Sequence, residues 1–117
     1  CPLTPETTGL MSRQRIALMQ PGALLINVSR GPVVDDAALI DSLASGQVGG
    51  AALDVFVTQP LPADHPYFGF DNVIITPHVG NTPRMAVPLL SARISDNVAR
   101  WARGEPLVGP VDVDAGY

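Results

Sequence analysis

The amino-acid sequence predicts an open α/β fold, in which helices connect the strands of a parallel sheet. Three short apolar runs, at residues 23–28, 49–55 and 72–76, are bounded by turn-forming residues. None of them alternates apolar with polar side chains, which favours strands buried on both faces of a parallel sheet. Apolar residues at helical spacing lie between the first two runs and after the third, an alternation typical of sheets with right-handed crossovers.

A short helix is expected before the first strand and a longer one after it. Ser12 can cap the first helix, over residues 12–19, by accepting a hydrogen bond from a main-chain N–H. Asp35 or Asp36 can cap the second helix. This helix is expected to end at residue 45, because Gly46 suits the left-handed conformation that follows many helices.

A proline-rich loop and a long helix complete the chain. The loop spans residues 59–66, and His65 within it is expected to be a solvent-facing turn residue. The last helix is expected over about residues 83–103. Its apolar residues, among them Leu89 and Trp101, recur at helical spacing and are expected to belong to a core.

Composition and charge exclude several classes of protein. The 117 residues include 11 acidic and 7 basic side chains, and all seven basic residues are Arg, so the formal net charge is -4. A chain with 46% hydrophobic and 15% charged residues is too apolar to be disordered, and without a basic run no nucleic-acid surface is expected. No apolar stretch is long enough to span a membrane. The single cysteine provides neither a disulfide framework nor the spacing of metal ligands.

Polar residues follow each predicted strand, where an open parallel sheet binds its ligands. Arg30, Asp54 and His78 stand at these three positions. The planar guanidinium of Arg binds both oxygens of a carboxylate, and His exchanges protons near neutral pH. The pattern therefore predicts a site for a small carboxylate with acid–base chemistry. Simpler roles stay open: a surface ion pair for Arg30, a loop position for His78, and a turn braced by Asp54.

Four segments of the chain resemble the D-isomer-specific 2-hydroxyacid dehydrogenases. They are residues 1–7 (CPLTPET), 21–31 (PGALLINVSRG), 50–56 (GAALDVF) and 76–80 (TPHVG). The resemblance covers essentially the whole chain, with the spacing of the family. It implies the second half of a Rossmann-type doubly wound parallel sheet, plus a C-terminal helix that returns to the substrate domain.

The resemblance also implies how the chain is organised. Residues 1–81 correspond to the C-terminal half of a dinucleotide-binding domain, and residues 82–117 to the helix and tail that join the substrate domain. The sequence lacks a G-x-G-x-x-G turn, which in this fold follows the first strand. We therefore expect the chain to be a fragment whose N-terminal part is missing, and to be inactive by itself.

The reaction implied by the resemblance is hydride transfer between NAD or NADP and a 2-oxo or 2-hydroxy acid. Arg30 would bind the substrate carboxylate and polarise the carbonyl, and His78 would exchange a proton with the carbonyl oxygen. Asp54 matches the residue that binds the nicotinamide carboxamide. No metal is expected. The positions that match cofactor-lining residues of the family are Cys1, Val28, Ser29, Arg30, Asp54, His78 and Gly80.

Gln59 departs from the pattern of the family, which usually has Glu at this position, paired with the catalytic His. A carboxylate beside an imidazole stabilises the imidazolium form, whereas an amide orients the ring without adding charge. We therefore include Gln59 with Arg30 and His78 in the predicted catalytic set. We expect His78 to stay neutral over a wider pH range than in relatives that carry Glu.

Two alternative functions remain open at this stage. NAD-dependent formate dehydrogenases resemble the chain in having an Arg, a Gln before Pro and a His after Pro, although the Ser-Gly that follows their His is absent here. A catalytically weak relative that senses NAD or serves as a scaffold is the second alternative. For the parent protein the resemblance implies a cytoplasmic homodimer that takes a small 2-oxo or 2-hydroxy acid and binds neither nucleic acid nor membrane.

Overall fold

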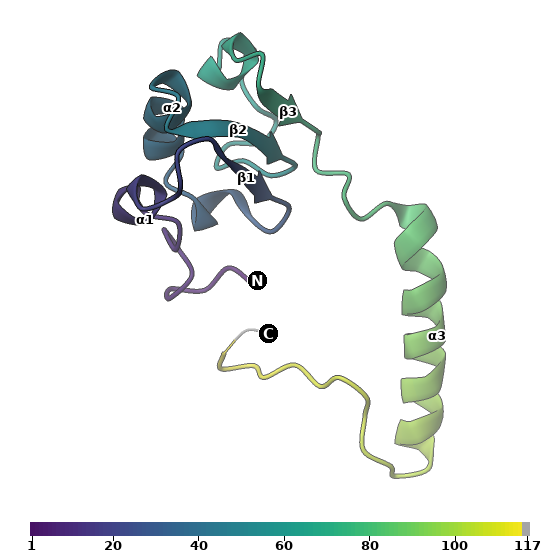
Figure 1. Ribbon diagram of the computed structural model, residues 1–117. Coiled ribbons are helices and arrows are strands. Elements are labelled where there is room, and N and C mark those ends of the chain that lie inside the picture. The colour runs from purple at the N-terminus through teal and green to yellow at the C-terminus, as the bar shows by residue number, and fades with distance from the viewer. Residues whose placement is uncertain (116–117) are drawn as a thin grey trace. The chain divides into compact units, whose positions relative to one another are not determined.

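The computed structural model describes residues 1–115, which form two compact units. The first extends from Cys1 to Gly80 and contains the sheet, and the second begins at Asn81 and contains one long helix (Figure 1). Within residues 1–115, no helix combines the length and the hydropathy that a membrane crossing requires.

The sheet of the first unit has three parallel strands in the order β1-β2-β3, which confirms the predicted architecture. Asn27 at the end of β1 lies opposite Leu53 at the end of β2, which in turn lies opposite Ile75 at the end of β3. The segments that follow the strands therefore leave the sheet at one common edge. The strands are β1 (Ala23–Asn27), β2 (Val48–Leu53) and β3 (Val73–Ile75).

Both helices of the first unit begin after an expected capping residue, which for the second helix is Asp35 rather than Asp36. The side chain of Ser12 accepts a hydrogen bond from the N–H of Arg15, and that of Asp35 from the N–H of Ala38. Gly46 follows the second helix with a φ of 77°, in the left-handed region where glycine is favoured. These helices are α1 (Arg13–Ala17) and α2 (Asp36–Ala44), and two short 3-10 helices are η1 (Gly31–Val33) and η2 (Pro66–Gly69).

Only one face of the sheet is covered within the first unit, so the expectation of strands buried on both faces is wrong. Leu24, Ile26 and Ile74 are each at least two-thirds exposed, whereas Leu25 between the first two is buried. The physical reason is that α1 and α2 pack together, and their apolar side chains join those of one sheet face in a single core. That core includes Ile16, Leu25, Leu39, Leu43, Val48, Ala51 and Leu53.

The η2 loop is tied to the start of α2 by a cluster of three polar side chains. The Tyr67 hydroxyl, whose residue is only 2% exposed, donates to Asp36 Oδ1 at 2.7 Å. His65 Nε2 lies 3.3 Å from Asp36 Oδ2, and His65 Nδ1 accepts from the N–H of Tyr67 at 3.4 Å. Burial, followed by the bond to Asp36, raises the pKa of Tyr67. The expectation that His65 faces solvent is wrong, because its side chain is only 18% exposed.

The second unit consists of α3 (Pro83–Ala102) and the chain after it. Leu89 and Trp101 are about three-quarters exposed, at 75% and 76%, so the expectation that they belong to a core is wrong for the described residues. One helix and an extended tail give these side chains no second apolar element within the unit.

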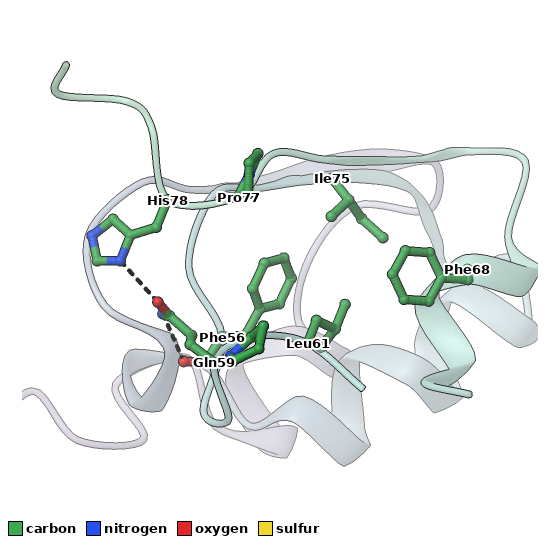
Figure 2. Close-up of a pocket in the computed structure, with 8 residues that line it drawn as sticks. Phe56, Gln59, Leu61, Phe68, Ile75, Pro77 and His78 are labelled. Carbon is green, nitrogen blue, oxygen red and sulfur yellow. Dashed lines mark hydrogen bonds between the residues drawn. The ribbon is translucent and has the colours of Figure 1, made fainter. Parts of the chain in front are cut away.

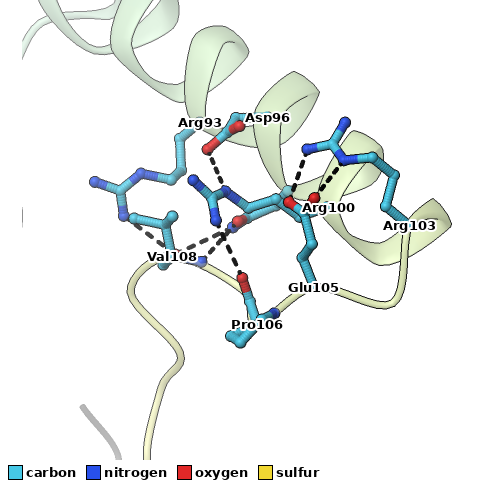
Figure 3. Close-up of polar contacts among 8 residues, drawn as sticks. Arg93, Asp96, Arg100, Arg103, Glu105, Pro106 and Val108 are labelled. Carbon is cyan, nitrogen blue, oxygen red and sulfur yellow. Dashed lines mark hydrogen bonds and ion pairs between the residues drawn. The ribbon is translucent and has the colours of Figure 1, made fainter.

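Polar contacts fold the tail back along α3. The Asn97 side chain donates to the carbonyl of Val108 at 3.1 Å and accepts from the N–H of the same residue at 2.8 Å. Arg103 forms an ion pair with Glu105 at 2.7 Å (Figure 3). The tail is thus held by a paired main-chain contact in addition to exposed charges.

Candidate active site

The three strand ends deliver Arg30, Asp54 and His78 to the common edge of the sheet. Arg30 and His78 each follow the last residue of their strand by three positions, and Asp54 follows β2 directly. Because Asn27, Leu53 and Ile75 are in register, these segments begin side by side. Carboxyl ends of parallel strands are where open α/β sheets bind ligands.

Asn27 shapes the turn that carries Ser29 and Arg30, and sequence reasoning missed it. Its buried side chain accepts from the N–H of Ser29 at 3.0 Å and from the Ser29 hydroxyl at 2.9 Å. Its amide nitrogen donates to the carbonyl of Arg30 at 3.0 Å. One polar side chain thus satisfies main-chain groups on both sides of the turn. The signal in the sequence is a lone polar residue within the apolar run of β1.

The Arg30 side chain is exposed, and its guanidinium donates to the carbonyl of Ser29 at 2.8 Å. No carboxylate forms an ion pair with it within residues 1–115. The turn packs closely against Phe56 at Gly31. A Cβ at Gly31 would overlap the carbonyl carbon and oxygen of Phe56. The turn that bears Arg30 therefore rests on the segment that leads to Gln59.

Asp54 braces the turn that presents His78. The carboxylate, only 4% exposed, accepts from the Thr76 hydroxyl at 2.6 Å and from the N–H groups of Val79 and Gly80, each at 2.8 Å. These bonds, that from Thr76 first, lower the pKa of Asp54. The simpler role of a turn brace is thus present in the structure. Oδ2 accepts one of the three bonds and keeps a lone pair for a further donor.

His78 occupies an unusual backbone conformation, with a φ of 56° in the left-handed region. Non-glycine residues in this region cost of the order of 1 kcal/mol or more and are concentrated at functional sites. The N–H of His78 donates to the carbonyl of Thr76 at 3.0 Å, and the next two N–H groups bind Asp54. The bonds to Asp54 stabilise the strained turn and fix the direction of the imidazole.

Gln59 is hydrogen-bonded to His78, with 2.9 Å between Gln59 Oε1 and His78 Nδ1 (Figure 2). The amide nitrogen of Gln59 donates to the carbonyl of Phe56 at 3.1 Å. The pair borders an apolar cavity of about 560 Å³, which is also lined by Leu61, Phe68 and Ile75. In Figure 2 the other ring nitrogen of His78, Nε2, points away from this cavity. The apolar cavity therefore lies on the side of the ring opposite to the nitrogen that is free for a ligand.

The remaining predicted residues occupy simpler positions. Val28 directly follows β1 and is 69% exposed. The exposed Cys1 makes no hydrogen bond to the other predicted site residues within residues 1–115. The same described residues contain no group of three or more His, Cys, Asp or Glu side chains placed to bind a metal ion. The structure thus joins Gln59 to His78 and Asp54 to Gly80, and leaves Cys1 apart.

Comparison with known proteins identifies the family of this sheet and site. The family model described as D-isomer specific 2-hydroxyacid dehydrogenase, NAD binding domain, matches residues 1–80. The chain belongs to the D-isomer-specific 2-hydroxyacid dehydrogenases. The resemblance inferred from the four sequence segments is thereby confirmed, and the sheet is part of a Rossmann-type fold.

Individual relatives agree with this assignment. A hydroxypyruvate reductase from Blautia hydrogenotrophica is 39% identical over 92% of the chain, which spans 33% of that protein. A D-isomer specific 2-hydroxyacid dehydrogenase from Xanthobacter autotrophicus, solved with NADPH and MES, is similar over the whole chain with a TM-score of 0.86 and 49% identity. An NADPH-dependent glyoxylate/hydroxypyruvate reductase from Sinorhizobium meliloti, solved with NADP and sulfate, has a TM-score of 0.90 and 36% identity over the whole chain. The chain spans 48% and 38% of those two structures.

The residues at the sheet edge fit the nicotinamide half of a dinucleotide. The exposed Val28 side chain offers an apolar surface for the ring, and the remaining lone pair on Asp54 Oδ2 suits the N–H of a carboxamide. A Cβ at Gly80 would lie 2.9 Å from Asp54 Oδ2, so glycine allows the backbone to approach this oxygen closely. The family description names NAD as the cofactor of this domain.

Proposed function

We propose that the complete protein containing this chain is an NAD(P)-dependent dehydrogenase that interconverts small 2-oxo acids and D-2-hydroxy acids. The observation that carries the proposal is the His78–Gln59 hydrogen bond at the sheet edge that also bears Arg30. A histidine held at Nδ1 has Nε2 available for acid–base chemistry. The guanidinium of Arg30, which forms no ion pair within residues 1–115, lies at the same edge and suits a carboxylate.

Arg30 binds the carboxylate of the substrate and polarises its 2-oxo group. The planar fork of the guanidinium matches two oxygens at once, which orients the substrate as well as holding it. The negative charge that develops on the carbonyl oxygen during reduction is stabilised by the same cation. Asn27 supports this role by fixing the turn that carries Arg30.

His78 is the acid–base residue of the proposed reaction. In reduction, protonated Nε2 gives its proton to the carbonyl oxygen as that oxygen gains charge, and in oxidation neutral Nε2 takes the proton from the hydroxyl group. A nicotinamide cofactor, when bound, would supply or accept the hydride at carbon 2 of the substrate. Gln59 orients the imidazole, and Asp54 braces the turn of His78. Oδ2 of Asp54 would accept a hydrogen bond from the carboxamide of the cofactor.

The organisation of the complete protein is part of the proposal. Residues 1–81 would form half of its dinucleotide-binding domain, and residues 82–117 would connect to the substrate domain. The glyoxylate and hydroxypyruvate reductases among the relatives support small 2-oxo acids as the class of substrate. A homodimer of the complete protein is proposed on the resemblance to the family.

The proposed function is tested by adding NADH or NADPH to the complete protein with a panel of 2-oxo acids and following nicotinamide absorbance. Oxidation of the cofactor by at least one member of the panel, lost on Arg30→Met, supports the proposal. Cofactor binding without turnover on the whole panel contradicts it and favours a sensor or scaffold.

One observation favours a second candidate, the oxidation of formate. The partner of His78 is an amide, and formate oxidation transfers a hydride without a proton relay. Formate is a small carboxylate that Arg30 would bind in the same way. Reduction of NAD by formate, in the absence of any 2-hydroxy acid, would select this candidate over the 2-hydroxyacid reaction.

A further inference from the structure

We infer that the main-chain carbonyl of Phe56 sets the tautomer of His78 through the side chain of Gln59. In this arrangement Nδ1 of His78 always carries a proton, and only Nε2 changes its protonation state. The exchange of that proton with a substrate rests on the proposed function. The tautomer itself follows from the hydrogen bonds of the chain.

The Phe56 carbonyl fixes the orientation of the Gln59 amide. A main-chain carbonyl oxygen only accepts hydrogen bonds, so the Gln59 atom that lies 3.1 Å from the Phe56 oxygen must be the amide nitrogen. The opposite orientation would place two oxygens against each other. The Phe56 carbonyl therefore determines that Oε1 of Gln59 faces His78.

The orientation of the Gln59 amide in turn fixes which nitrogen of the His78 imidazole carries the proton. Oε1 of Gln59 is also only an acceptor, and it lies 2.9 Å from Nδ1 of His78, so Nδ1 must be the donor. Neutral His78 then has its lone pair on Nε2, which points away from the Gln59 side of the ring (Figure 2). Asp54 does not compete for the ring, because its hydrogen bonds go to Thr76, Val79 and Gly80.

The position of the Phe56 carbonyl is fixed by the packing of this residue and by the close approach of Gly31. The residue is buried, and its ring packs near that of Tyr67 with 6.4 Å between the centroids. Gly31 lies against the carbonyl carbon and oxygen so closely that a Cβ would overlap them. One peptide group thus supports both the turn that bears Arg30 and the amide that orients His78.

A glutamate at position 59 could not make the same pair of contacts. An ionised carboxylate accepts from Nδ1 of His78, but it has no hydrogen to donate to the Phe56 carbonyl. The amide has one donor and one acceptor group, and both are used here. Gln59 is accordingly a positioning residue whose effect depends on a main-chain group.

The tautomer is measured by two-bond ¹H–¹⁵N correlation spectra of the complete protein with ¹⁵N-labelled histidine, above the pH at which His78 becomes neutral. We expect His78 to be protonated at Nδ1, in contrast to free imidazole side chains, which favour Nε2. His65 is an internal reference, because its Nδ1 accepts from Tyr67 and its Nε2 faces Asp36, which requires the opposite tautomer. Neutral His78 protonated at Nε2 would overturn the inference.

Two variants locate the origin of this preference. Gln59→Met removes both hydrogen bonds and should return His78 to the Nε2-protonated tautomer. Replacing Val57 by its α-hydroxy analogue turns the Phe56 carbonyl into an ester, a weaker acceptor, and leaves every side chain unchanged. The N–H lost with Val57 donates no main-chain or side-chain bond within residues 1–115. The ester should lower the Nδ1-protonated fraction, and an unchanged fraction would overturn the role of the carbonyl.

Activity supplies a second readout that separates this inference from the proposed function. Gln59→Met should lower kcat for oxidation by about 10- to 100-fold, as expected for the loss of one or two hydrogen bonds, with a smaller change in KM. Asp36→Asn, at the partner of His65, is the matched control and should leave the His78 signals unchanged. A protein that turns over no substrate contradicts the proposed function, while its spectra still decide the tautomer.

Discussion

His65 and His78 are the two histidines of the chain, and they differ in how many of their ring nitrogens are engaged. Both nitrogens of His65 are used, Nδ1 by the N–H of Tyr67 and Nε2 by the carboxylate of Asp36. Within residues 1–115, His78 uses Nδ1 alone, toward the amide of Gln59. A histidine with two occupied nitrogens holds a loop in place, whereas one with a free nitrogen is available for proton exchange. The resemblance to the family implies a Glu beside His78, but in this chain the carboxylate partner belongs to His65.

The two histidines also differ in their backbone conformation. His65 caps η2 from an extended conformation, with a φ of −64°. His78 lies in the left-handed region with a φ of 56°, and the three bonds of Asp54 compensate for this strain. Backbone strain that the surrounding structure compensates is typical of functional sites. At His78 it indicates that the direction of the imidazole matters more than the stability of the turn.

The largest expected effect comes from removing each histidine in turn. His78→Gln should lower the rate of 2-oxo acid reduction by about 10²–10⁴-fold, the usual contribution of a general acid. His65→Gln should leave the rate within about threefold and lower the melting temperature instead, because it leaves Asp36 with one partner fewer. Steady-state kinetics and thermal unfolding of the complete protein test both. Equal losses of rate in the two variants would contradict the comparison.

Exchanging the two kinds of partner gives the next largest effect. Gln59→Glu places a carboxylate beside His78, which stabilises the imidazolium form and should move the His78-dependent limb of the pH–rate profile upward by about one unit or more. Reduction, which needs the protonated ring, then persists to higher pH. Asp36→Asn removes the carboxylate from His65 and should leave the profile in place. Superimposable pH–rate profiles for the Gln59→Glu variant and the native protein would show that the charge of the residue beside His78 does not affect its protonation.

A smaller effect is expected on the structural side. Tyr67→Phe removes the hydroxyl that donates to Asp36 at 2.7 Å and leaves the buried ring in place. The free energy of unfolding should fall by about 1 kcal/mol, the net value of one hydrogen bond, with kcat unchanged. Denaturant unfolding of the complete protein measures the first quantity. A loss of kcat at full stability would mean that the η2 loop acts on the site.

The smallest expected effect is the protonation of Asp54 at acid pH, which affects only the turn that carries His78. The pKa of Asp54 is lowered from its ordinary value of 3.8, so its ionised form stabilises the folded state above that value, and this contribution is lost as pH falls through the lower pKa of the folded protein. The amide signals of Val79 and Gly80 should therefore titrate together, with a midpoint below 3.8. A midpoint above that value would contradict the proposed brace.

Elements that depend on neighbouring residues could be predicted from the sequence. Ser12, Asp35 and Gly46 act within one helical turn of their own positions. The sequence predicts Ser12 and Gly46 at these positions, and for the second cap it leaves Asp35 and Asp36 as alternatives. The strands were placed within two residues, because apolar runs between turns are also local signals. Burial on both faces was predicted wrongly, since it depends on what covers each face rather than on the strand.

Contacts between distant segments account for what the sequence did not reveal. The partner of Tyr67 lies 31 positions earlier, and nothing near His65 indicates that Asp36 would meet it. Asn27 was hidden inside an apolar run, although its position at the end of a strand is a usable signal. The pairing of Gln59 with His78 was expected only through the resemblance. The orientation of the Gln59 amide could not be predicted from the sequence, because it depends on the main-chain carbonyl of Phe56, a group that every residue has.

We propose that Arg30 and His78 act on one small carboxylate at the edge of the sheet. A crystal structure of the complete protein with NADH and oxamate, an unreactive analogue of a 2-oxo acid, tests it most directly. We predict that the guanidinium of Arg30 binds the carboxylate and that Nε2 of His78 lies within hydrogen-bond distance of the neighbouring carbonyl oxygen. Oxamate bound without Arg30, or Nε2 of His78 turned away from it, would contradict the claim.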